Sequence, residues 1–531
     1  MVVPPVDAAV GWGATLTLAR AFAPYVMRTA GRNLAMLTGA SATLPRRRLL
    51  LLAAGGVAGV LAACSAPAAP AGKSEPAAPA PKQEAAAPVV KPAEPAKPAE
   101  APKPTAAPAA PAQKYEVTFL TTQTNPADVK IYETLSEAFT KANPNLTVKV
   151  TAESGTNIDQ KLLTYLTAGT LPDIIQTNDN FAAPYKKAGI SVNMIPFAEK
   201  SGFPYKDFDP TFLNLGIVDG ELHMLPKQGD VIVPYVNLKL AKEGGVEPPL
   251  KLDPSKEADK WTWDEYDAMV KHLTVDANGK RGDQAGFDKD NVAVYGASIQ
   301  ADAWWMYVPR VLAEGGKFIS DDLSKSEINS PAGVEAFKRL TDPMKNGYWA
   351  PLTLIQTMNN QAGNVFAAGK AATAPLQRLW CPTFRASLKD EFDVMHFPRG
   401  KAKRVTGMGT FGFTMTTKAK NPDAAWKFLE FMYGEEGMKI MTASYSAVPA
   451  MKRFYNSPFW RDLPAPPANN AVFVDAFDYG TTPPRLPFYS TGPFRQAVTD
   501  GITAIVLGKS TPEQVVAEID KVLTQIIAEK K

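Results

Sequence analysis

Aromatic and hydrogen-bonding side chains gather in two short stretches of the chain. The stretch DAWWMY places Trp304, Trp305 and Tyr307 together, and PLQRLWCPTF places Arg378 and Trp380 shortly after the turn FAAGK. Sugars have apolar C–H faces with hydroxyls at their edges, so a sugar site needs flat rings flanked by side chains that form hydrogen bonds. These two stretches are therefore candidates for a carbohydrate-binding site.

The same aromatic residues also have an interpretation as core residues. For Trp304 or Trp305 taken singly, packing in the core is as good an interpretation as contact with a ligand. Adjacent residues usually cannot both face one cleft. We therefore expect only one of these two rings to do so.

Motifs of enzymes and nucleotide-binding proteins occur only in incomplete form. The sequence GMGTFG at residues 407–412 matches G-x-G-x-x-G, but a strand-like sequence follows it where a dinucleotide site needs a helix. We interpret these glycines as positions where the backbone approaches a cleft closely. The three histidines lack zinc-ligand spacing, and no G-x-S-x-G sequence is present. Carboxylates are plentiful, so an acid–base pair of a glycosidase stays open.

Strand and helix patterns alternate from residue 115 to residue 179. Apolar residues alternate in 115–119 and 146–150, helical stripes cover 131–139 and 158–166, and PDIIQTND reads as a third strand. This β-α-β-α-β order predicts an α/β fold with an open, mostly parallel sheet. Ligands bind outside the carboxyl ends of such strands, where the polar sequences TTQ (121–123) and TND (177–179) are found.

Size and composition restrict the class of protein. Residues 114–531 are too many for one ordinary core and suit two lobes. With 45% hydrophobic and 21% charged residues, the composition is that of a soluble globular protein. The formal net charge is only +4, and no basic patch is interleaved with aromatic residues, which argues against nucleic acid as a partner.

An apolar run near the N-terminus has the features of an export signal. Three arginines precede about fifteen apolar residues, fewer than the roughly twenty that cross a bilayer as a helix. The sequence LAAC that ends at Cys64 resembles the lipobox of bacterial lipoproteins, which implies cleavage before Cys64 and attachment of a lipid to its sulfur. We assign residues 1–63 to the signal region, in which Met36 would start a signal of more usual length. Export by the general or the twin-arginine route is left open.

The segment after this cysteine has a low-complexity composition. Residues 64–113 are mostly alanine and proline with scattered lysine and glutamate, and such a segment buries too little apolar surface to fold. We expect a disordered tether that holds the globular part away from a membrane. Because Cys64 is assigned to the lipid, Cys381 has no cysteine partner for a disulfide bond.

Five stretches of the globular part follow one another in an order known from one protein family. They are FTKANPNLTVKV, KLLTYLTAGTLPDII, WTWDEYDAMVKHLT, VFAAGKAA and NPDAAWKFLEFMYGEEG. In this order the chain resembles the family 1 extracellular solute-binding proteins, the receptors of sugar-importing ABC transporters. The resemblance covers nearly all of residues 114–531.

The resemblance implies an α/β fold of the two-lobe, periplasmic-binding-protein-like type (class II), with discontinuous lobes joined by a hinge. Lobe 1 is expected to comprise residues 114–233 with 402–446, and lobe 2 residues 236–398 with 449–531. The chain is expected to cross between the lobes near residues 231–235, 397–404 and 444–449. Two departures from the family pattern, His223-Met224 and Tyr235-Val236-Asn237, lie near the expected cleft.

The resemblance also implies roles for single residues. An aromatic after the FAAGK turn stacks on the ligand in this family, and Trp380 fits that role. Asp179 and Asn180 match positions that contact ligand, and Asp230 matches an aspartate at the first crossing. The complete set of predicted ligand-binding residues is Thr177, Asp179, Asn180, Asp230, Tyr235, Trp304, Trp305, Arg378, Trp380, Thr410, Phe411 and Tyr445.

The function predicted from sequence is that of a binding protein, not of an enzyme. A lipid-anchored, monomeric receptor on the outer face of the cell membrane would bind a carbohydrate or related small polar solute between its lobes. It would deliver the ligand to the permease subunits of an ABC transporter, with no cofactor and no metal. Two alternatives remain: an exported carbohydrate-active enzyme, and a ligand-sensing module for a membrane signalling partner.

Overall fold

The computed structural model describes residues 114–124, 126–153, 158–253, 256, 260–389, 391–482 and 493–529. All of them belong to one compact unit, residues 104–531. The predicted signal region, Cys64 and the tether lie outside the described residues. Among the helices of the described residues, none combines the length and the apolar character needed to cross a bilayer.

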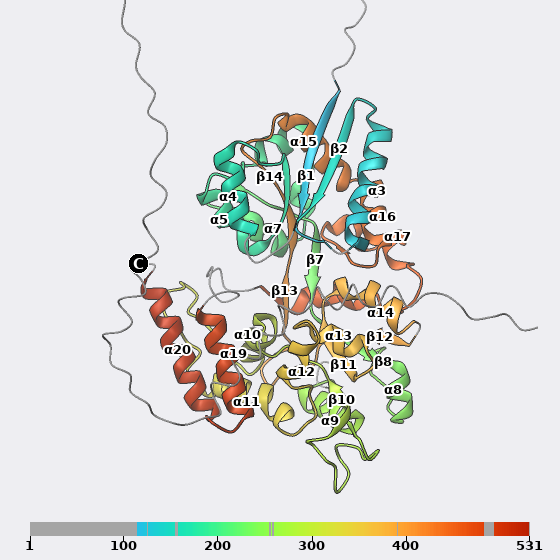
Figure 1. Ribbon diagram of the computed structural model, residues 1–531, viewed down its shortest axis with the longest axis vertical. Helices are drawn as coiled ribbons and strands as arrows, with labels where there is room; N and C mark the ends of the chain where they lie inside the picture. Colours follow the sequence, from blue (N-terminus) through green and yellow to red (C-terminus); the bar gives the residue numbers. More distant parts are fainter. Residues whose placement is uncertain are drawn as a thin grey trace, which may run out of the picture. The chain divides into compact units, whose positions relative to one another are not determined.

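The upper lobe in Figure 1 is built on a five-stranded sheet of order β2-β1-β3-β14-β6. Its strands are β1 (Tyr115–Thr121), β2 (Leu146–Ala152), β3 (Ile174–Asn178), β14 (Phe411–Met415) and β6 (Leu225–Pro226). Strands β2 and β3 pair in parallel with β1, and β14 pairs antiparallel with β3. The predicted β-α-β-α-β start of an open sheet is therefore confirmed.

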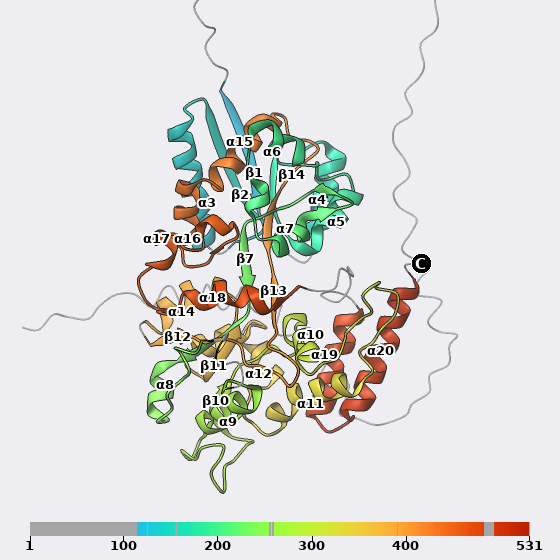
Figure 2. The ribbon, with the colours of Figure 1, turned by 180° about the vertical axis from the view of Figure 1, so that it is seen from behind.

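Helices cover both faces of the upper sheet (Figures 1 and 2). They are α3 (Pro126–Ala142), α4 (Ile158–Ala168), α5 (Ala182–Lys187), α6 (Ile195–Ser201), α7 (Pro210–Gly216), α15 (Pro422–Met432) and α16 (Glu435–Ala443), with a small hairpin of β4 (Ile217–Val218) and β5 (Glu221–Leu222). Phe119 meets Tyr132, Phe413 and Phe428 edge to face, with centroids 5.0, 5.7 and 6.2 Å apart. These rings join α3 and α15 to the sheet.

The lower lobe has its own five-stranded sheet, of order β12-β8-β11-β10-β9. Its strands are β12 (Phe392–Val394), β8 (Val233–Asn237), β11 (Ala371–Leu376), β10 (Val292–Ala297) and β9 (Val275–Asp276). Strands β10 and β11 are parallel, whereas β8 is antiparallel to both of its neighbours. Each lobe thus mixes parallel and antiparallel pairs.

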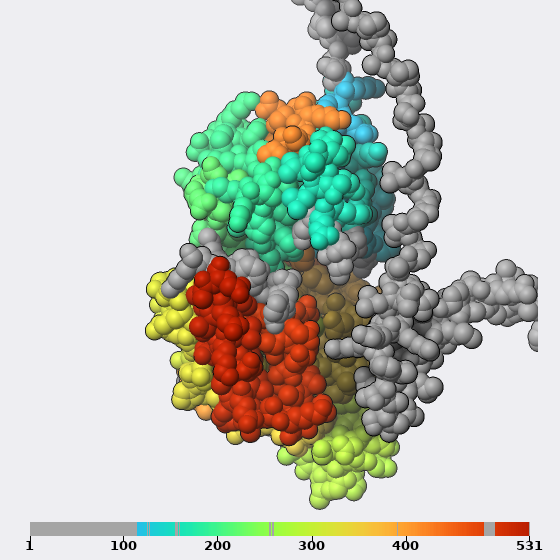
Figure 3. Space-filling model, turned by 60° about the vertical axis from the view of Figure 1, so that its left-hand side comes forward, coloured from blue at the N-terminus to red at the C-terminus, as the bar shows by residue number. Residues whose placement is uncertain are grey.

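Ten of the described helices belong to the lower lobe. They are α8 (Leu238–Glu243), α9 (Trp263–Leu273), α10 (Trp304–Ala313), α11 (Pro331–Lys345), α12 (Leu352–Thr357), α13 (Ala362–Ala367), α14 (Cys381–Ser387), α18 (Ala471–Asp475), α19 (Pro493–Val506) and α20 (Pro512–Ala528). Helix α17 (Pro458–Arg461) lies beside α16 of the upper lobe (Figures 1 and 2). The C-terminal pair, α19 and α20, forms one side of this lobe (Figure 3). Helix α20 begins with a capping box, in which Thr511 and Gln514 each bond the other's backbone N–H.

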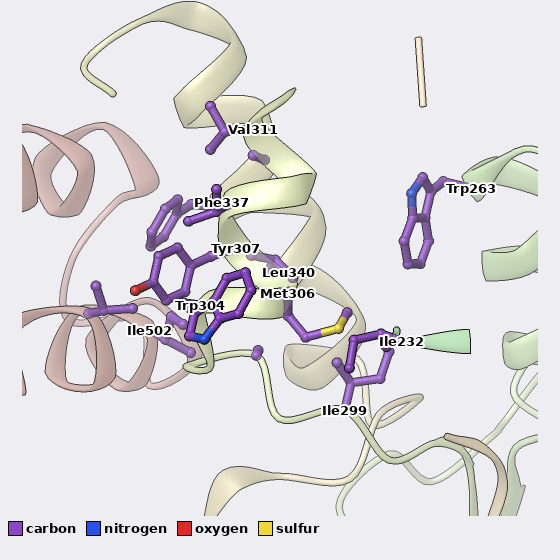
Figure 4. Packing of buried hydrophobic residues seen from close by; sticks show 14 of the residues in the cluster. Ile232, Trp263, Ile299, Trp304, Met306, Tyr307, Val311, Phe337, Leu340 and Ile502 are labelled. Atoms are coloured by element: carbon purple, nitrogen blue, oxygen red, sulfur yellow. The ribbon is translucent and has the colours of Figure 1, made fainter. Parts of the chain in front are cut away.

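The core of the lower lobe joins segments that are far apart in sequence. Tyr307 of α10, Phe337 of α11 and Ile502 of α19 belong to one buried cluster, together with Trp304 at the start of α10. Figure 4 shows Trp304 among the packed side chains of this cluster. The position of α10 is therefore fixed by the core beneath it.

A third sheet, of order β15-β7-β13-β16, runs between the lobes. It contains β7 (Gln228–Val231), β13 (Thr406–Gly409), β15 (Val448–Pro449) and β16 (Gly480–Thr481). Strand β7 is antiparallel to both β13 and β15, so three segments that are far apart in the sequence are hydrogen-bonded side by side. In Figure 1, β7 and β13 lead from one lobe into the other.

Two crossings lie later in the chain than the sequence predicts. The second was expected at residues 397–404, but Arg404 donates to the Phe397 carbonyl and the Ala402 N–H bonds Ala313, which keeps this loop on the lower lobe. The crossing strand is β13 instead. The third was expected to end at residue 449, yet Met451 and Phe454 pack in the core of the upper lobe. Hydrogen bonds within the lower lobe set the first of these boundaries, and apolar contacts in the upper lobe set the second.

Candidate functional site

A cavity of about 230 Å³ lies where the crossing strands meet both lobes. The end of β3, strands β7 and β13, the start of α10 and the segment after β11 all contribute to its wall. Its lining residues are Asn178, Asp179, Asn180, Asp230, Ile232, Trp304, Trp305, Gln377, Leu379, Gly407, Met408, Gly409, Thr410 and Phe411.

The wall from the upper lobe is held by backbone hydrogen bonds at the end of β3. The Asp179 N–H donates to the Thr410 carbonyl over 3.1 Å, and the Asn180 N–H donates to Asn178 Oδ1 over 3.0 Å. The first bond fixes Asp179 against the strand that follows β13. The side chains at the end of a parallel strand therefore face the cavity, as the general rule for such sheets predicts.

Two glycines of β13 allow unusually close contacts. A Cβ atom at Gly407 would lie 2.7 Å from the Cα of Trp305, and one at Gly409 would lie 2.8 Å from Asp179 Oδ2. Any larger residue at these positions would push the helix start or the carboxyl group away. This placement agrees with our interpretation of GMGTFG as a backbone that approaches a cleft.

Two carboxyl groups share the cavity. Gly409 is the partner of Asp230 in the β13–β7 pairing, and Asp179 Oδ2 lies against the same glycine, so the two aspartates flank one residue. Removal from water raises the pKa of Asp179 to about 7. Burial and then the charge of Asp179 raise the pKa of Asp230 to about 8, against a lowering by Lys227. Near neutral pH the pair therefore holds protons that free carboxyl groups would have lost.

A buried lysine lies behind this pair. Lys227 is 2% exposed, its Nζ donates to Gln123 Oε1 over 3.2 Å, and it lies 5.2 Å from the centre of the Tyr132 ring. Burial lowers the pKa of Lys227 to about 8, although Asp128 and Asp230 act in the opposite direction. The lysine does not line the cavity.

The wall from the lower lobe consists mainly of two indole rings. Trp304 and Trp305 are the first residues of α10, and their rings meet edge to face with centroids 6.0 Å apart. Trp304 is 9% exposed and belongs to the core cluster, whereas Trp305 is half-buried. Both line the cavity, so our expectation that only one of the two would face it is wrong. Trp305 offers the larger free surface.

Comparison with known proteins places the chain in a family. The sequence model of the bacterial extracellular solute-binding proteins matches residues 134–468, more than half of the chain. The chain belongs to this family. A protein of Brucella abortus named as a binding protein is 23% identical over 398 residues, which cover 73% of this chain and 87% of the relative.

Solved structures of solute-binding proteins share the fold. The ABC substrate-binding protein of Listeria monocytogenes in complex with cycloalternan has a TM-score of 0.66 at 22% identity, covering 78% of this chain and all of that one. The GacH receptor of Streptomyces glaucescens, solved unliganded and with acarbose, has a TM-score of 0.63 at 19% identity and covers 78% of this chain and 99% of its own. The predicted two-lobe fold is thus confirmed.

Five residues that the sequence assigned to the ligand of this solute-binding protein lie away from the cavity. Tyr235 is completely buried, and its hydroxyl bonds the Gln377 carbonyl and Cys381 Sγ, both over 3.2 Å. Thr177 is also buried within the pairing of β3 and β14. Tyr445 lies under the Arg385 guanidinium, 3.9 Å from the ring centre. The other two, Arg378 and Trp380, follow β11.

In the segment after β11, the structure turns the two predicted side chains away from the cavity and their neighbours toward it. Arg378 is 1% exposed, lies 4.4 Å from the ring centre of Trp460, and donates to Asn470 over 2.7 Å. Trp380 stacks on Phe384 at 5.7 Å and covers Gly363, whose Cβ position is 2.5 Å from the indole. The residues between and before them, Gln377 and Leu379, line the cavity instead.

Thr410 and Phe411, the weaker candidates, do line the cavity. The Thr410 hydroxyl donates to the Gln228 carbonyl over 2.5 Å. Its proton is therefore used within the protein, and Thr410 contributes to the shape of the cavity wall. Among the described residues, no three His, Cys, Asp or Glu side chains are grouped as metal ligands. Ile232 and Met408, which sequence reasoning missed, add apolar surface. Ile232 lies within the predicted first crossing, and Met408 lies on β13, the crossing strand that the sequence located too early.

Proposed function

We propose that this protein captures a carbohydrate between its two lobes and delivers it to the permease of an ABC transporter. Its location would be the outer face of the cell membrane, to which a lipid on Cys64 would anchor it. The observation that carries the proposal is the pairing, in one cavity, of indole rings from the lower lobe with Asp179 and Asn180 of the upper lobe and Asp230 of the crossing strand β7.

This arrangement suits the two kinds of surface on a sugar ring. The face of Trp305 can cover the apolar C–H groups, and Asp179, Asn180 and Asp230 can accept or donate hydrogen bonds at the hydroxyl edges. Because the two walls belong to different lobes, a ligand between them gains most contacts when the lobes are closed. The solute-binding family and the ligands named for the Listeria and Streptomyces structures support the same reading.

A screen of carbohydrates by thermal shift, followed by small-angle scattering, tests the proposal. We expect a subset of mono- or oligosaccharides to raise the melting temperature of residues 114–531, and the radius of gyration to fall on binding. A sugar recovered chemically unchanged after long incubation would distinguish a receptor from an exported hydrolase. If no carbohydrate stabilises the protein, the proposal is wrong.

The anchor has a separate test. In cells, replacing Cys64 with serine should remove the lipid and move the protein from the membrane to the soluble fraction. Membrane association that survives Cys64→Ser would contradict the assignment of the lipobox.

A further inference from the structure

The ionisable groups that line the cavity are all acidic. Among its lining residues, Asp179 and Asp230 are the ionisable side chains, and none is lysine, arginine or histidine. The nearest buried cation, Lys227, is directed to Gln123 and the Tyr132 ring. A negatively charged solute would meet two carboxyl groups with no cation in the wall to balance them, which disfavours it strongly.

Both carboxyl groups have an oxygen atom without a hydrogen-bond partner among the described residues. These atoms are Asp179 Oδ2 and Asp230 Oδ1, and each is shielded from solvent. Asp230 is 8% exposed and lines the cavity. A buried carboxyl oxygen without a donor is costly, so such atoms in a binding cavity point to a donor that the ligand supplies.

The position of Gly409 makes one donor sufficient for both groups. Because Asp179 Oδ2 lies against this glycine, Asp230 is its strand partner and the charge of Asp179 acts on Asp230, one donor beside Gly409 can serve both carboxyl groups. A hydroxyl has one proton to donate, whereas an ammonium group has three and also balances the charge of the carboxylates. The adjacent face of Trp305 adds a favourable surface for a cation.

We propose that the ligand is a sugar carrying a protonated amine, which binds between Asp179 and Asp230 while the sugar ring lies against Trp305. This inference rests on the proposed carbohydrate function and narrows it to basic amino sugars. It requires no bond to be made or broken.

Binding of a cation at this point has a consequence for protons. In the free protein, burial keeps both carboxyl groups partly protonated near neutral pH, with pKa values of about 7 and 8. The other charged groups that act on the pair are Lys227 and, through it, Asp128, and the lining residues from α10 and from 377–379 do not titrate. A cation lowers the pKa of both carboxyl groups, so binding should release protons, whereas a neutral sugar should release none.

Ligands that share one sugar ring but differ in charge separate the contribution of the ammonium group to binding from that of the ring. Glucosamine, N-acetylglucosamine and glucose have the same ring with an ammonium, a neutral amide and a hydroxyl, and the corresponding disaccharides extend the series. We expect calorimetry at pH 7 to give the amines at least about tenfold tighter binding than either neutral form, because charge-assisted hydrogen bonds are roughly twice as strong. Titration in two buffers of different ionisation enthalpy should show proton release for the amines alone.

The outcomes distinguish this inference from the proposed function. Equal or tighter binding of glucose or N-acetylglucosamine would overturn the inference and leave the carbohydrate function intact. Putrescine, which has two amines and no sugar ring, tests whether the amine alone is sufficient for binding. If it binds as tightly as glucosamine, the amine is recognised and the carbohydrate function is wrong. Failure of every sugar and every amine would overturn both.

Substitution of one carboxyl provides the matched variant. Asp230→Asn should reduce the preference for glucosamine over glucose to about twofold or less and abolish proton release. The control is Asp302→Asn, since Asp302 is 7% exposed, accepts from Thr499 over 3.1 Å and lies outside the cavity wall. The inference fails if Asp230→Asn keeps the full preference, or if Asp302→Asn loses it equally.

Discussion

The two walls of the cavity are built in different ways. The upper wall is formed by strand ends and a glycine strand, so its polar groups are placed by the backbone: the Asp179 N–H bonds Thr410, and Asp230 pairs with Gly409. The lower wall is formed by side chains from the start of α10 and from the loop after β11. A wall placed by backbone tolerates few changes of geometry, whereas a wall of side chains can change its specificity by substitution.

The sharpest test of the lower wall concerns Trp305. Its ring is half-buried in the free protein, and loss of the stacking surface should weaken sugar binding by roughly 2–3 kcal/mol, or about a hundredfold. Calorimetry of Trp305→Ala with the tightest sugar of the screen measures this loss. Because the ring also packs against the lower-lobe core, the melting temperature of the free variant should fall, so affinity is measured where the variant is folded. An unchanged affinity would remove Trp305 from the site.

Trp380 provides the contrasting aromatic. Because its ring covers Gly363 and stacks on Phe384, Trp380→Ala should leave a cavity in the lower lobe and cost about 2 kcal/mol of unfolding free energy. Sugar affinity of the folded variant should stay within a factor of two. Denaturant unfolding and calorimetry on one preparation distinguish a core role from a ligand contact. Lost affinity at normal stability would show that Trp380 contacts the ligand.

The upper wall is tested by the pH dependence of stability. The pKa of Asp230, about 8 when folded, lies well above the value near 3.9 of an unfolded aspartate. The folded protein therefore binds more protons between these values, and this group makes it less stable as pH rises from about 4 to 8. Asp230→Asn removes the effect.

We expect Asp230→Asn to be more stable than the parent at pH 8 by about 1–2 kcal/mol, and to gain less at pH 5. Denaturant unfolding at both pH values measures the difference, with Asp302→Asn as the control. An equal gain at the two pH values would show that the carboxyl of Asp230 is not perturbed by burial.

The smallest expected effect concerns a contact between the lobes. Tyr445 follows α16 of the upper lobe, and the Arg385 guanidinium of α14 in the lower lobe lies 3.9 Å from its ring centre. Tyr445→Leu removes this cation–π contact, so the closed arrangement should lose about 0.5–1 kcal/mol and sugar affinity should fall about two- to fivefold. Unchanged affinity would mean that the contact does not contribute to closure.

The same contrast explains what the sequence could predict. The polar end of β3 follows from strand order, because ligands bind outside the carboxyl ends of strands in such sheets. Asp179 was placed in this way and by resemblance to the family, whereas Asn180 and Asp230 were placed by the resemblance alone, and all three line the cavity. Their role as ligand contacts stays a prediction.

The aromatic wall could not be predicted to the same degree. A short 3₁₀ turn at Arg378–Trp380 decides which side chains of that segment face the cavity, and its rotation depends on packing against Trp460 and Phe384. Composition identifies the segment as a candidate, but it does not show that Gln377 faces the cavity and that Arg378 does not. Tyr235 fails for a related reason, because its strand lies inside the lower sheet rather than at its edge.

The discontinuity of both lobes affects how the chain can fold during synthesis. The upper sheet needs β14 from residues 411–415, and the core of the lower lobe needs α19 and α20 from residues 493–528. Domains that are contiguous in sequence can fold one after the other as they leave the ribosome. Here the first lobe cannot close its sheet until four-fifths of the chain has been made, and the second waits for its last two helices. A nascent chain of this protein therefore stays without a finished core for most of its synthesis, which is the state that a chain needs if it is to be threaded unfolded through a membrane pore.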